Sequence, residues 1–437
     1  MKSQITTDPL SFPFSAPESV PGSIPFAAVI PPIPGGNDPL TEVLRRGAHT
    51  LLTQAVEAEV TQWLATHAHV VDEQGHQQVV RNGYAQERTI VTGVGPLAVT
   101  MPRVHDRRSI PEREKFTSAL LPPYLRKTKS IEELLPWLYL KGISTGDFGD
   151  ALAALLGPDC PGLSASTITR LKEVWEADFR GWQQRDLKGK HYVYIWADGI
   201  YFNIRLADPP GERACILVLL GATADGTKEV IAVQDGHRES EQSWSGMLLD
   251  LKARGLTTDP KLAIGDGALG FWAALRKAFP TTREQRCWVH KTVNVLDQLP
   301  KCLHGQAKDK LHQIWMAPRK QDALQAFDLF IQTYQNKYPE ATARLEKDRE
   351  ELLAFYDYPA EHWAHLRTTN PIESMFATVR LRTVKTKGCG SRLATLTMVY
   401  QLALTAQKSF RKLNGHALLE AVIAGVIFTD GVQAKAA

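Results

Sequence analysis

The chain has 437 residues, more than one ordinary hydrophobic core organises, so we expect two to four domains. Its 43% hydrophobic and 22% charged residues are typical of a folded water-soluble protein, and no apolar run is long enough to cross a bilayer. The net charge of +4 excludes few partners, because the placement of the basic residues matters more than their number.

The start of the chain is rich in proline. Residues 1–39 contain nine prolines with Ser and Gly between them, a composition that cannot build a core and predicts a disordered leader. No secretory signal precedes it, and the five unevenly spaced cysteines do not suggest a disulfide framework, so we expect a cytoplasmic protein. From Leu40, apolar residues recur at helical spacing and predict an amphipathic helix to about His67.

A β-hairpin with basic surroundings is predicted next. Residues 89–92 and 97–101 alternate in character around a Gly-Val-Gly-Pro turn. From Arg103 to Lys129, eight basic residues stand against three acidic ones. This run is either a solvated surface or a face that contacts DNA, since affinity for duplex DNA comes largely from Lys and Arg on phosphates. The candidate phosphate contacts are Arg103, Arg107, Arg108, Arg126 and Lys127.

Residues 130–186 are predicted to form a compact group of helices. A short helix, a turn, and a further helix that opens with Ser, Thr and Arg resemble a helix-turn-helix, which reads DNA through its last helix. The side chains that would reach the groove are Ser166, Thr167, Thr169 and Arg170. A small helical bundle with no role in DNA binding has the same pattern, so both explanations stay open.

Residues 191–205, HYVYIWADGIYFNIR, hold the first candidate catalytic acid. The run is apolar and strand-forming apart from Asp198, and burial of a carboxylate is unfavourable unless something pairs with it. Asp198 and Gly199 form either a hairpin turn or the end of a central strand whose acid holds a metal ion. The pattern recurs in residues 261–267, where Asp266 ends a short apolar strand, and this favours the metal ion.

The order of predicted elements after residue 190 is three strands, helix, strand, helix, strand, helix, with the last strand around residues 285–289 and the last helix over residues 291–299. Consecutive strands pair antiparallel, whereas strands reached through a helix are parallel, so we expect an α/β fold with a mixed sheet and helices on both faces. Asp198 and Asp266 then lie on neighbouring strands. Their oxygen ligands suit two Mg²⁺ or Mn²⁺ ions, about 3.5–4 Å apart, which clamp both oxygens of a phosphodiester.

The third candidate acid follows a block that we expect to be entirely helical, residues 302–366. In TTNPIES, Pro371 suits the first turn of a helix, Asn370 its cap, and Glu373 lies three residues on. Glu373 is either part of a capping box or a metal ligand among basic residues that contact phosphates. The basic neighbours considered as DNA contacts are Arg380, Arg382, Lys385, Lys387 and Arg392.

A Cys-x-x-His pair, Cys287 and His290, lies after the second acid. With Cys302 and His304 it offers ligands for zinc, although no zinc-knuckle spacing accompanies it and a structural or active-site-adjacent role is the better explanation. Three tryptophans could stack on an unpaired base near the cut end, but core packing is the better explanation for each: Trp244, Trp272 and Trp288.

These motifs, in this order over about residues 40–410, resemble the Mutator-like group of bacterial insertion-sequence transposases. The matching segments are RNGYAQERTIVTGVGPLAVTMPR, LYLKGISTGDF, LSASTITRLKEVW, the Asp198 strand, LKARGL, IGDGALGFWAAL, QRCWVHK and TTNPIES. The resemblance implies a ribonuclease-H-like catalytic core interrupted by the helical block, with a DDE triad at Asp198, Asp266 and Glu373. Mainly helical DNA-binding domains would precede the core.

The resemblance implies two-metal cleavage at the terminal inverted repeats and strand transfer into target DNA, with no nucleotide cofactor, no membrane, and a homodimer or larger assembly on DNA. A catalytically silent DNA-binding regulator and a ribonuclease-H-like nuclease or resolvase are the alternatives. The expected divisions are the leader 1–39, the helix and ribbon 40–129, the helices 130–186, the first core part 187–300, the insertion 301–366 and the last core part 367–437.

Overall fold

The computed structural model describes residues 39–143, 147–157, 160, 165–203, 213–236, 238–267, 269–385 and 391–434. They divide into two compact units. The first holds residues 39–131, 150–157 and 160, and the second holds the rest. The predicted leader and Lys387 lie outside the described residues. No helix within these ranges combines the length and apolar character needed to cross a bilayer.

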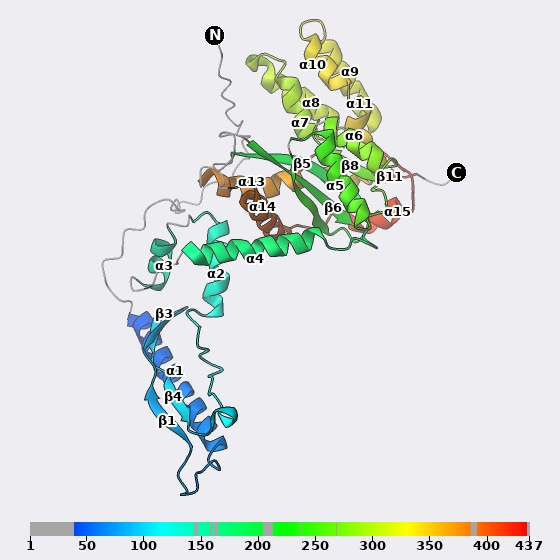
Figure 1. The fold of residues 1–437 in the computed structure, drawn as a ribbon. Coiled ribbons are helices and arrows are strands. Elements are labelled where there is room, and N and C mark those ends of the chain that lie inside the picture. The colour runs from blue at the N-terminus through cyan, green and yellow to red at the C-terminus, as the bar shows by residue number, and fades with distance from the viewer. Residues whose placement is uncertain are drawn as a thin grey trace. The chain divides into compact units, whose positions relative to one another are not determined.

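The first unit packs one long helix against paired strands (Figure 1). Its elements are α1 (Pro39–Thr66), β1 (Val79–Tyr84), β2 (Arg88–Thr92), β3 (Gly95–Val99) and β4 (Pro102–Asp106). The predicted hairpin is the antiparallel pair β2–β3, and a second antiparallel pair, β1–β4, was not predicted. The described part of this unit therefore contains more sheet than the mainly helical fold that the resemblance implied. A small core joins helix to strands through Val56, Ile90, Leu97, Val99 and Leu121.

Three helices follow in chain order: α2 (Lys129–Leu140), α3 (Phe148–Leu156) and α4 (Ala165–Gln183). Trp175 and Phe179 of α4 are buried, whereas Val174 is 51% exposed. Most of α3 belongs to the first unit, and α4 belongs to the second. The helix-turn-helix would therefore contain residues of both units, and it stays a prediction.

The second unit is built on a five-stranded mixed sheet in the order β7-β6-β5-β8-β9. Strands β5, β6 and β7 pair antiparallel, and β8 and β9 run parallel to β5, as the sequence predicts. The last strand differs from prediction, because β9 ends at Arg286 and helix α7 already begins at Trp288. The strand bounds are Tyr192–Asn203, Arg213–Thr223, Lys228–Gly236, Leu262–Gly265 and Arg283–Arg286 for β5 to β9.

Each face of this sheet has its own hydrophobic core, because successive side chains of a strand point to opposite faces. Ile195 and Ala197 of β5 pack with Trp244 and Trp272, which lie on helices α5 (Glu241–Ala253) and α6 (Leu269–Ala278). Trp196 packs in the other core with Trp288 and with the helices of the C-terminal part. All three tryptophans considered for base stacking are thus core residues, at most 2% exposed.

Residues 302–366 form helices joined by turns and contain no strand, as predicted. It comprises α8 (His304–Trp315), α9 (Lys320–Tyr334), α10 (Pro339–Glu346), α11 (Arg349–Leu352) and α12 (Trp363–Leu366), with short 3₁₀ turns between some of them. After it come α13 (Asn370–Lys385), α14 (Arg392–Gln407), α15 (Leu419–Ile423) and a small ladder of β10 (Phe428–Thr429) and β11 (Val432–Gln433). Helix α7 (Trp288–Leu296) leads into this block.

Candidate active site

Asp198 lies inside a continuous strand. Strand β5 runs unbroken through Asp198 and Gly199, and Asp198 pairs with Val218 of β6. The hairpin explanation of Asp-Gly is therefore wrong, and so is the expectation that Asp198 ends its strand.

The register of the parallel strands sets Asp198 beside Asp266. On the β8 side of β5, the last register pair is Ala197 with Gly265. Asp198 is the next residue of β5, and Asp266 is the first residue after the end of β8. Because adjacent strands lie about 4.8 Å apart, the two acids start from neighbouring backbone positions, as the sequence predicts.

The environment of Asp198 disfavours its charge. The residue is 8% exposed. Burial raises its pKa to about 7, and the negative charges of Glu239 and Asp266 act in the same direction, against the positive charge of His290. Its carboxylate accepts a hydrogen bond of 2.8 Å from the Gly199 amide. A buried carboxylate beside further carboxylates binds cations readily, since a cation removes the repulsion.

The backbone of Asp266 is held by two side chains. Its carbonyl oxygen accepts hydrogen bonds from the Trp272 indole at 3.1 Å and from the Arg286 guanidinium at 2.9 Å. Arg286 in turn forms an ion pair of 3.2 Å with Asp348, which comes from the helical insertion. Asp348 also pairs with Lys291 of α7. The insertion therefore helps to fix the loop that carries Asp266.

Glu373 lies in the first turn of α13, close to the Cys-x-x-His pair. Its carboxylate accepts a hydrogen bond of 2.9 Å from the Thr369 hydroxyl and lies 3.9 Å from His290 Nδ1. The backbone amide of Thr369 donates to Cys287 Sγ at 3.3 Å. A capping box would direct the carboxylate to a backbone amide. Here the Glu373 carboxylate contacts the side chains of His290 and Thr369 instead.

Cys287 and His290 adjoin the candidate acids. Cys287 is the N-cap residue of α7. The prediction that it lies on a strand is therefore wrong. Ligand atoms of Cys287, His290 and Glu373 all lie within 4.8 Å of one another. Burial acts to lower the pKa of His290, but the Cys287 sulfur and the charges of Asp266 and Asp198 outweigh it and raise the pKa to about 10. His290 is thus a cation among the acids.

The four-ligand zinc site is not formed. Cys302 is exposed, and His304 Nε2 lies 3.0 Å from the Leu299 carbonyl oxygen. Among the described residues, neither joins the group of Cys287, His290 and Glu373.

A fourth acid, Glu239, was missed by the sequence reasoning. It lies between β7 and α5, directly before the Ser240 cap of α5. Burial and the charge of Asp266 raise its pKa, and its side chain lies against the backbone of Gly199. Its position after the third predicted strand and directly before a capping Ser was the available signal.

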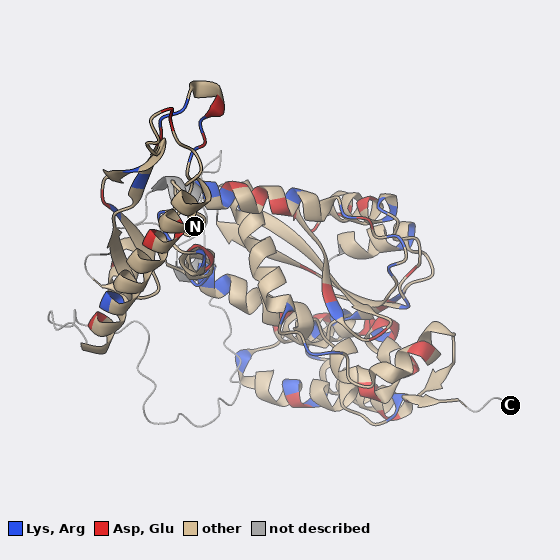
Figure 2. Cartoon of the chain, turned by 90° about the horizontal axis from the view of Figure 1, so that it is seen from below, with Lys and Arg blue, Asp and Glu red and all other residues tan. Residues whose placement is uncertain are grey.

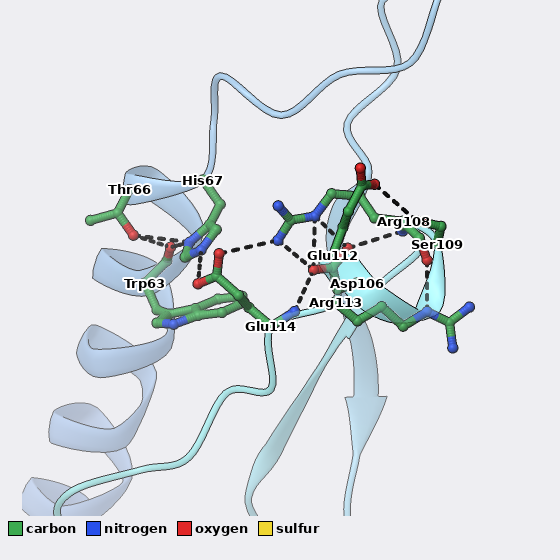
Figure 3. Close-up of polar contacts among 9 residues, drawn as sticks. All are labelled: Trp63, Thr66, His67, Asp106, Arg108, Ser109, Glu112, Arg113 and Glu114. Carbon is green, nitrogen blue, oxygen red and sulfur yellow. Dashed lines mark hydrogen bonds and ion pairs between the residues drawn. The ribbon is translucent and has the colours of Figure 1, made fainter.

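The basic residues proposed for DNA contact differ in their availability. Arg103, Arg107, Arg126, Arg170 and Arg380 are exposed. Arg108 forms an ion pair of 2.6 Å with buried Asp106 and a further one with Glu114 (Figure 3), so it stabilises the β4 corner. Because charge-assisted contacts of this kind hold the guanidinium in place, Arg108 is a poor candidate for phosphate.

Lys127, also in the first unit, is partly exposed. The remaining candidates lie in the second unit, where acidic and basic residues are interspersed along the helices (Figure 2). Arg382 is 3% exposed and lies over the Tyr139 ring, which removes it from the surface contacts. Arg392 is 3.3 Å from Asp235. The side chains of Ser166, Thr167, Thr169 and Lys385 are outside the described part of the structure.

Comparison with known proteins identifies the chain. Residues 36–412 match the family described as "Transposase, Mutator family". The transposase for insertion sequence element IS6120 of Mycolicibacterium smegmatis is 51% identical over 69% of this chain and 92% of the relative. The transposase for IST2 of Acidithiobacillus ferrooxidans is 49% identical over 65% and 96%.

The transposase for IS256 in transposon Tn4001 of Staphylococcus aureus is more distant, at 29% identity over 76% of this chain and 82% of the relative. The family match spans both compact units and every candidate acid. The chain therefore belongs to the Mutator family of transposases.

Proposed function

We propose that this transposase cleaves DNA at the terminal inverted repeats of its insertion sequence and joins the freed 3′ end to target DNA, using Asp198, Asp266 and Glu373 as a DDE triad. The adjacency of Asp198 and Asp266 in the β5–β8 register carries the proposal. The strand order supports a ribonuclease-H-like core, since the first three strands are antiparallel and the next two extend the sheet on the other side of β5.

The donor set fits two hard divalent cations such as Mg²⁺ or Mn²⁺. Burial makes the negative charges of Asp198 and Glu239 unfavourable in the absence of a cation, and the charge of Asp266 adds to this for both. Oxygen ligands of this kind select Mg²⁺ or Mn²⁺ rather than a soft metal. Two such ions, when bound, would activate the attacking oxygen and stabilise the leaving oxygen of an in-line displacement.

The protein's own side chains then have separate tasks. Asp198 provides an oxygen ligand from β5, Asp266 provides one from the loop that follows β8, and Glu373 provides another from α13, where the Thr369 hydroxyl orients it. His290 offsets part of the negative charge between the acids and Glu373. Cleavage by water and joining by a 3′-hydroxyl are both in-line displacements, so one arrangement serves both steps.

DNA binding is assigned to exposed basic residues of both units. Arg103, Arg107 and Arg126 of the first unit and Arg170 and Arg380 of the second remain as phosphate contacts, because each is exposed. We further propose that two copies act together on DNA, since each reaction must hold two transposon ends.

The test is metal-dependent joining of a labelled oligonucleotide that carries the element's terminal repeat to a plasmid target. Wild type with Mg²⁺ or Mn²⁺ should join, Glu373→Gln should bind but not join, and Glu346→Gln, an exposed acid of α10, should match wild type. Binding without cleavage by wild type would favour the silent regulator. Cleavage without joining would favour a nuclease or resolvase.

A further inference from the structure

A cavity of about 630 Å³ lies in the second unit beside the helix that carries Glu373. Pro371, Ser374, Met375 and Thr378 of α13 line it. Their spacing places them on one face of the helix, and Glu373 lies off that face. The cavity is therefore separate from the group of acids but shares its supporting helix.

The lining is basic. The titratable residues that line the cavity are Lys141, Lys228, His365 and Arg411, and its described lining includes no Asp or Glu. Three of these carry a positive charge in ordinary conditions. The field inside therefore favours an anion.

Lys228 is the most unusual member of the lining. It is 7% exposed, its ammonium donates to the Arg411 carbonyl at 3.1 Å, and it lies 3.4 Å from His365 Nδ1. None of the carboxylates in the described ranges forms an ion pair with it. A buried cation without a counter-charge is unfavourable, and burial lowers its pKa to about 8. Lys228 also lowers the pKa of His365, after burial itself.

The remaining lining suits a nucleotide. Phe410 offers an aromatic surface, and the hydroxyl groups of Ser374, Thr378, Thr405 and Ser409 offer hydrogen bonds. Pockets of about 300–1,000 Å³ hold small organic ligands, so this cavity has room for one nucleotide. A duplex, whose major groove alone is about 12 Å wide, does not fit.

We propose that this cavity binds one unpaired nucleotide of the DNA strand, with its phosphate on Lys228 and its base against Phe410. The proposal rests on the proposed function, because it assigns a binding place to the DNA strand that extends from the carboxylates along α13. It explains why a lysine is buried there without an acid: the phosphate supplies the missing charge. Stacking on an aromatic ring tolerates any base, so the pocket does not require a particular sequence.

The experiment compares two labelled duplexes that carry the element's terminal repeat, one blunt and one with three unpaired nucleotides at the cleaved end. Binding is measured by fluorescence anisotropy over a range of salt concentrations. Wild type should prefer the unpaired end by about fivefold or more, the lower end of what stacking one base contributes. Mononucleotide, and inorganic phosphate in a parallel arm, serve as competitors.

Three variants test the charge of Lys228 and the free volume of the cavity separately. Lys228→Gln should lose the preference and reduce the slope of log K against log salt by about 0.7, as expected for one single-strand phosphate contact. Thr405→Phe, at an exposed position of the rim, should lose the preference by filling the cavity. Lys412→Gln, which removes an exposed lysine paired with Asp225 at 3.0 Å, should behave as wild type.

The outcomes distinguish this site from the proposed function. Competition by mononucleotide but not by phosphate supports a nucleotide site, and competition by phosphate alone overturns the role of Phe410. Equal binding of both duplexes by wild type, with joining intact, overturns the cavity proposal and leaves the transposase chemistry standing. Unchanged preference in both Lys228→Gln and Thr405→Phe also overturns it. Failure of wild type to bind either duplex overturns both.

Discussion

The carboxyl group of Glu239 lies directly against the backbone of Gly199, so that a β-carbon at residue 199 would meet it at 2.7 Å. Glycine is therefore present in Asp198-Gly199 to admit a second acid and not to form a turn. The same strand then presents Asp198 to Asp266 and leaves room for Glu239 beside them.

Gly199→Ala should displace the Glu239 carboxyl group and weaken metal-dependent joining. The added methyl group meets the side chain well inside van der Waals contact, so the acid must move away. We expect a higher Mg²⁺ concentration for half-maximal joining, with the fold retained. Gly305→Ala is the matched control, since nothing lies within 4 Å of its new β-carbon. An unchanged Mg²⁺ dependence in Gly199→Ala would show that Glu239 has no part in the site.

Asp198→Asn should abolish cleavage and joining but leave binding of the terminal repeat. The substitution keeps the volume of the side chain and removes its charge, so the β5–β6 pairing is preserved. We expect a loss of at least about 10²-fold, the scale for removing one group that stabilises charge in the transition state. The measurement is single-turnover joining beside an electrophoretic binding assay. Joining at the wild-type rate would remove Asp198 from the triad.

Asp348→Ala should destabilise the second unit. It leaves Arg286 and Lys291, both at most 8% exposed, without their shared acid. Breaking a buried ion pair by removal of one partner costs about 3–5 kcal/mol, because an uncompensated charge stays buried.

The measurement for Asp348→Ala is chemical denaturation. Its control is Asp322→Ala, which breaks the more exposed pair with Arg319 and should change the free energy of unfolding by about 1 kcal/mol or less. A similarly small change in Asp348→Ala would contradict the role of the Arg286–Asp348 pair. Because Arg286 also binds the Asp266 carbonyl, the variant should lose joining activity before it unfolds.

Acid should weaken the first unit through Asp106. The Arg108 guanidinium holds the pKa of Asp106 well below its ordinary value near 3.8. A carboxyl group whose pKa falls on folding stabilises the fold above its unfolded pKa, and this stability is lost as pH falls through the folded pKa.

Thermal unfolding of Asp106→Asn measures this contribution. The difference in melting temperature from wild type should be full above about pH 4 and shrink below it, since the unfolded pKa of Asp is about 3.9. Glu73→Gln, at an exposed position, should show no such pH dependence. A difference that is constant from pH 7 to pH 2 would mean that Arg108 does not hold Asp106 as an ion.

The sequence predicted the architecture around the acids well, because β5, β6 and β7 are rich in aliphatic, β-branched and aromatic residues and lie between clear breaks. The chain order of β5 to β9 and the helical block after β9 follow from these breaks between the elements. The boundary at Cys287 was misplaced, because QRCWVH is apolar enough to continue a strand and has no capping residue to mark the start of α7.

The sequence by itself determined the family, the three candidate acids and the mixed sheet, since all of these depend on residue types in chain order. The fold in three dimensions sets Asp198 within a strand paired to β6, brings the Glu239 carboxyl group against Gly199, and buries Arg382 over the Tyr139 ring. It also decided that Lys228 is buried in a basic cavity. These are contacts between residues far apart in the chain, and local spacing carries no information about which distant side chains meet.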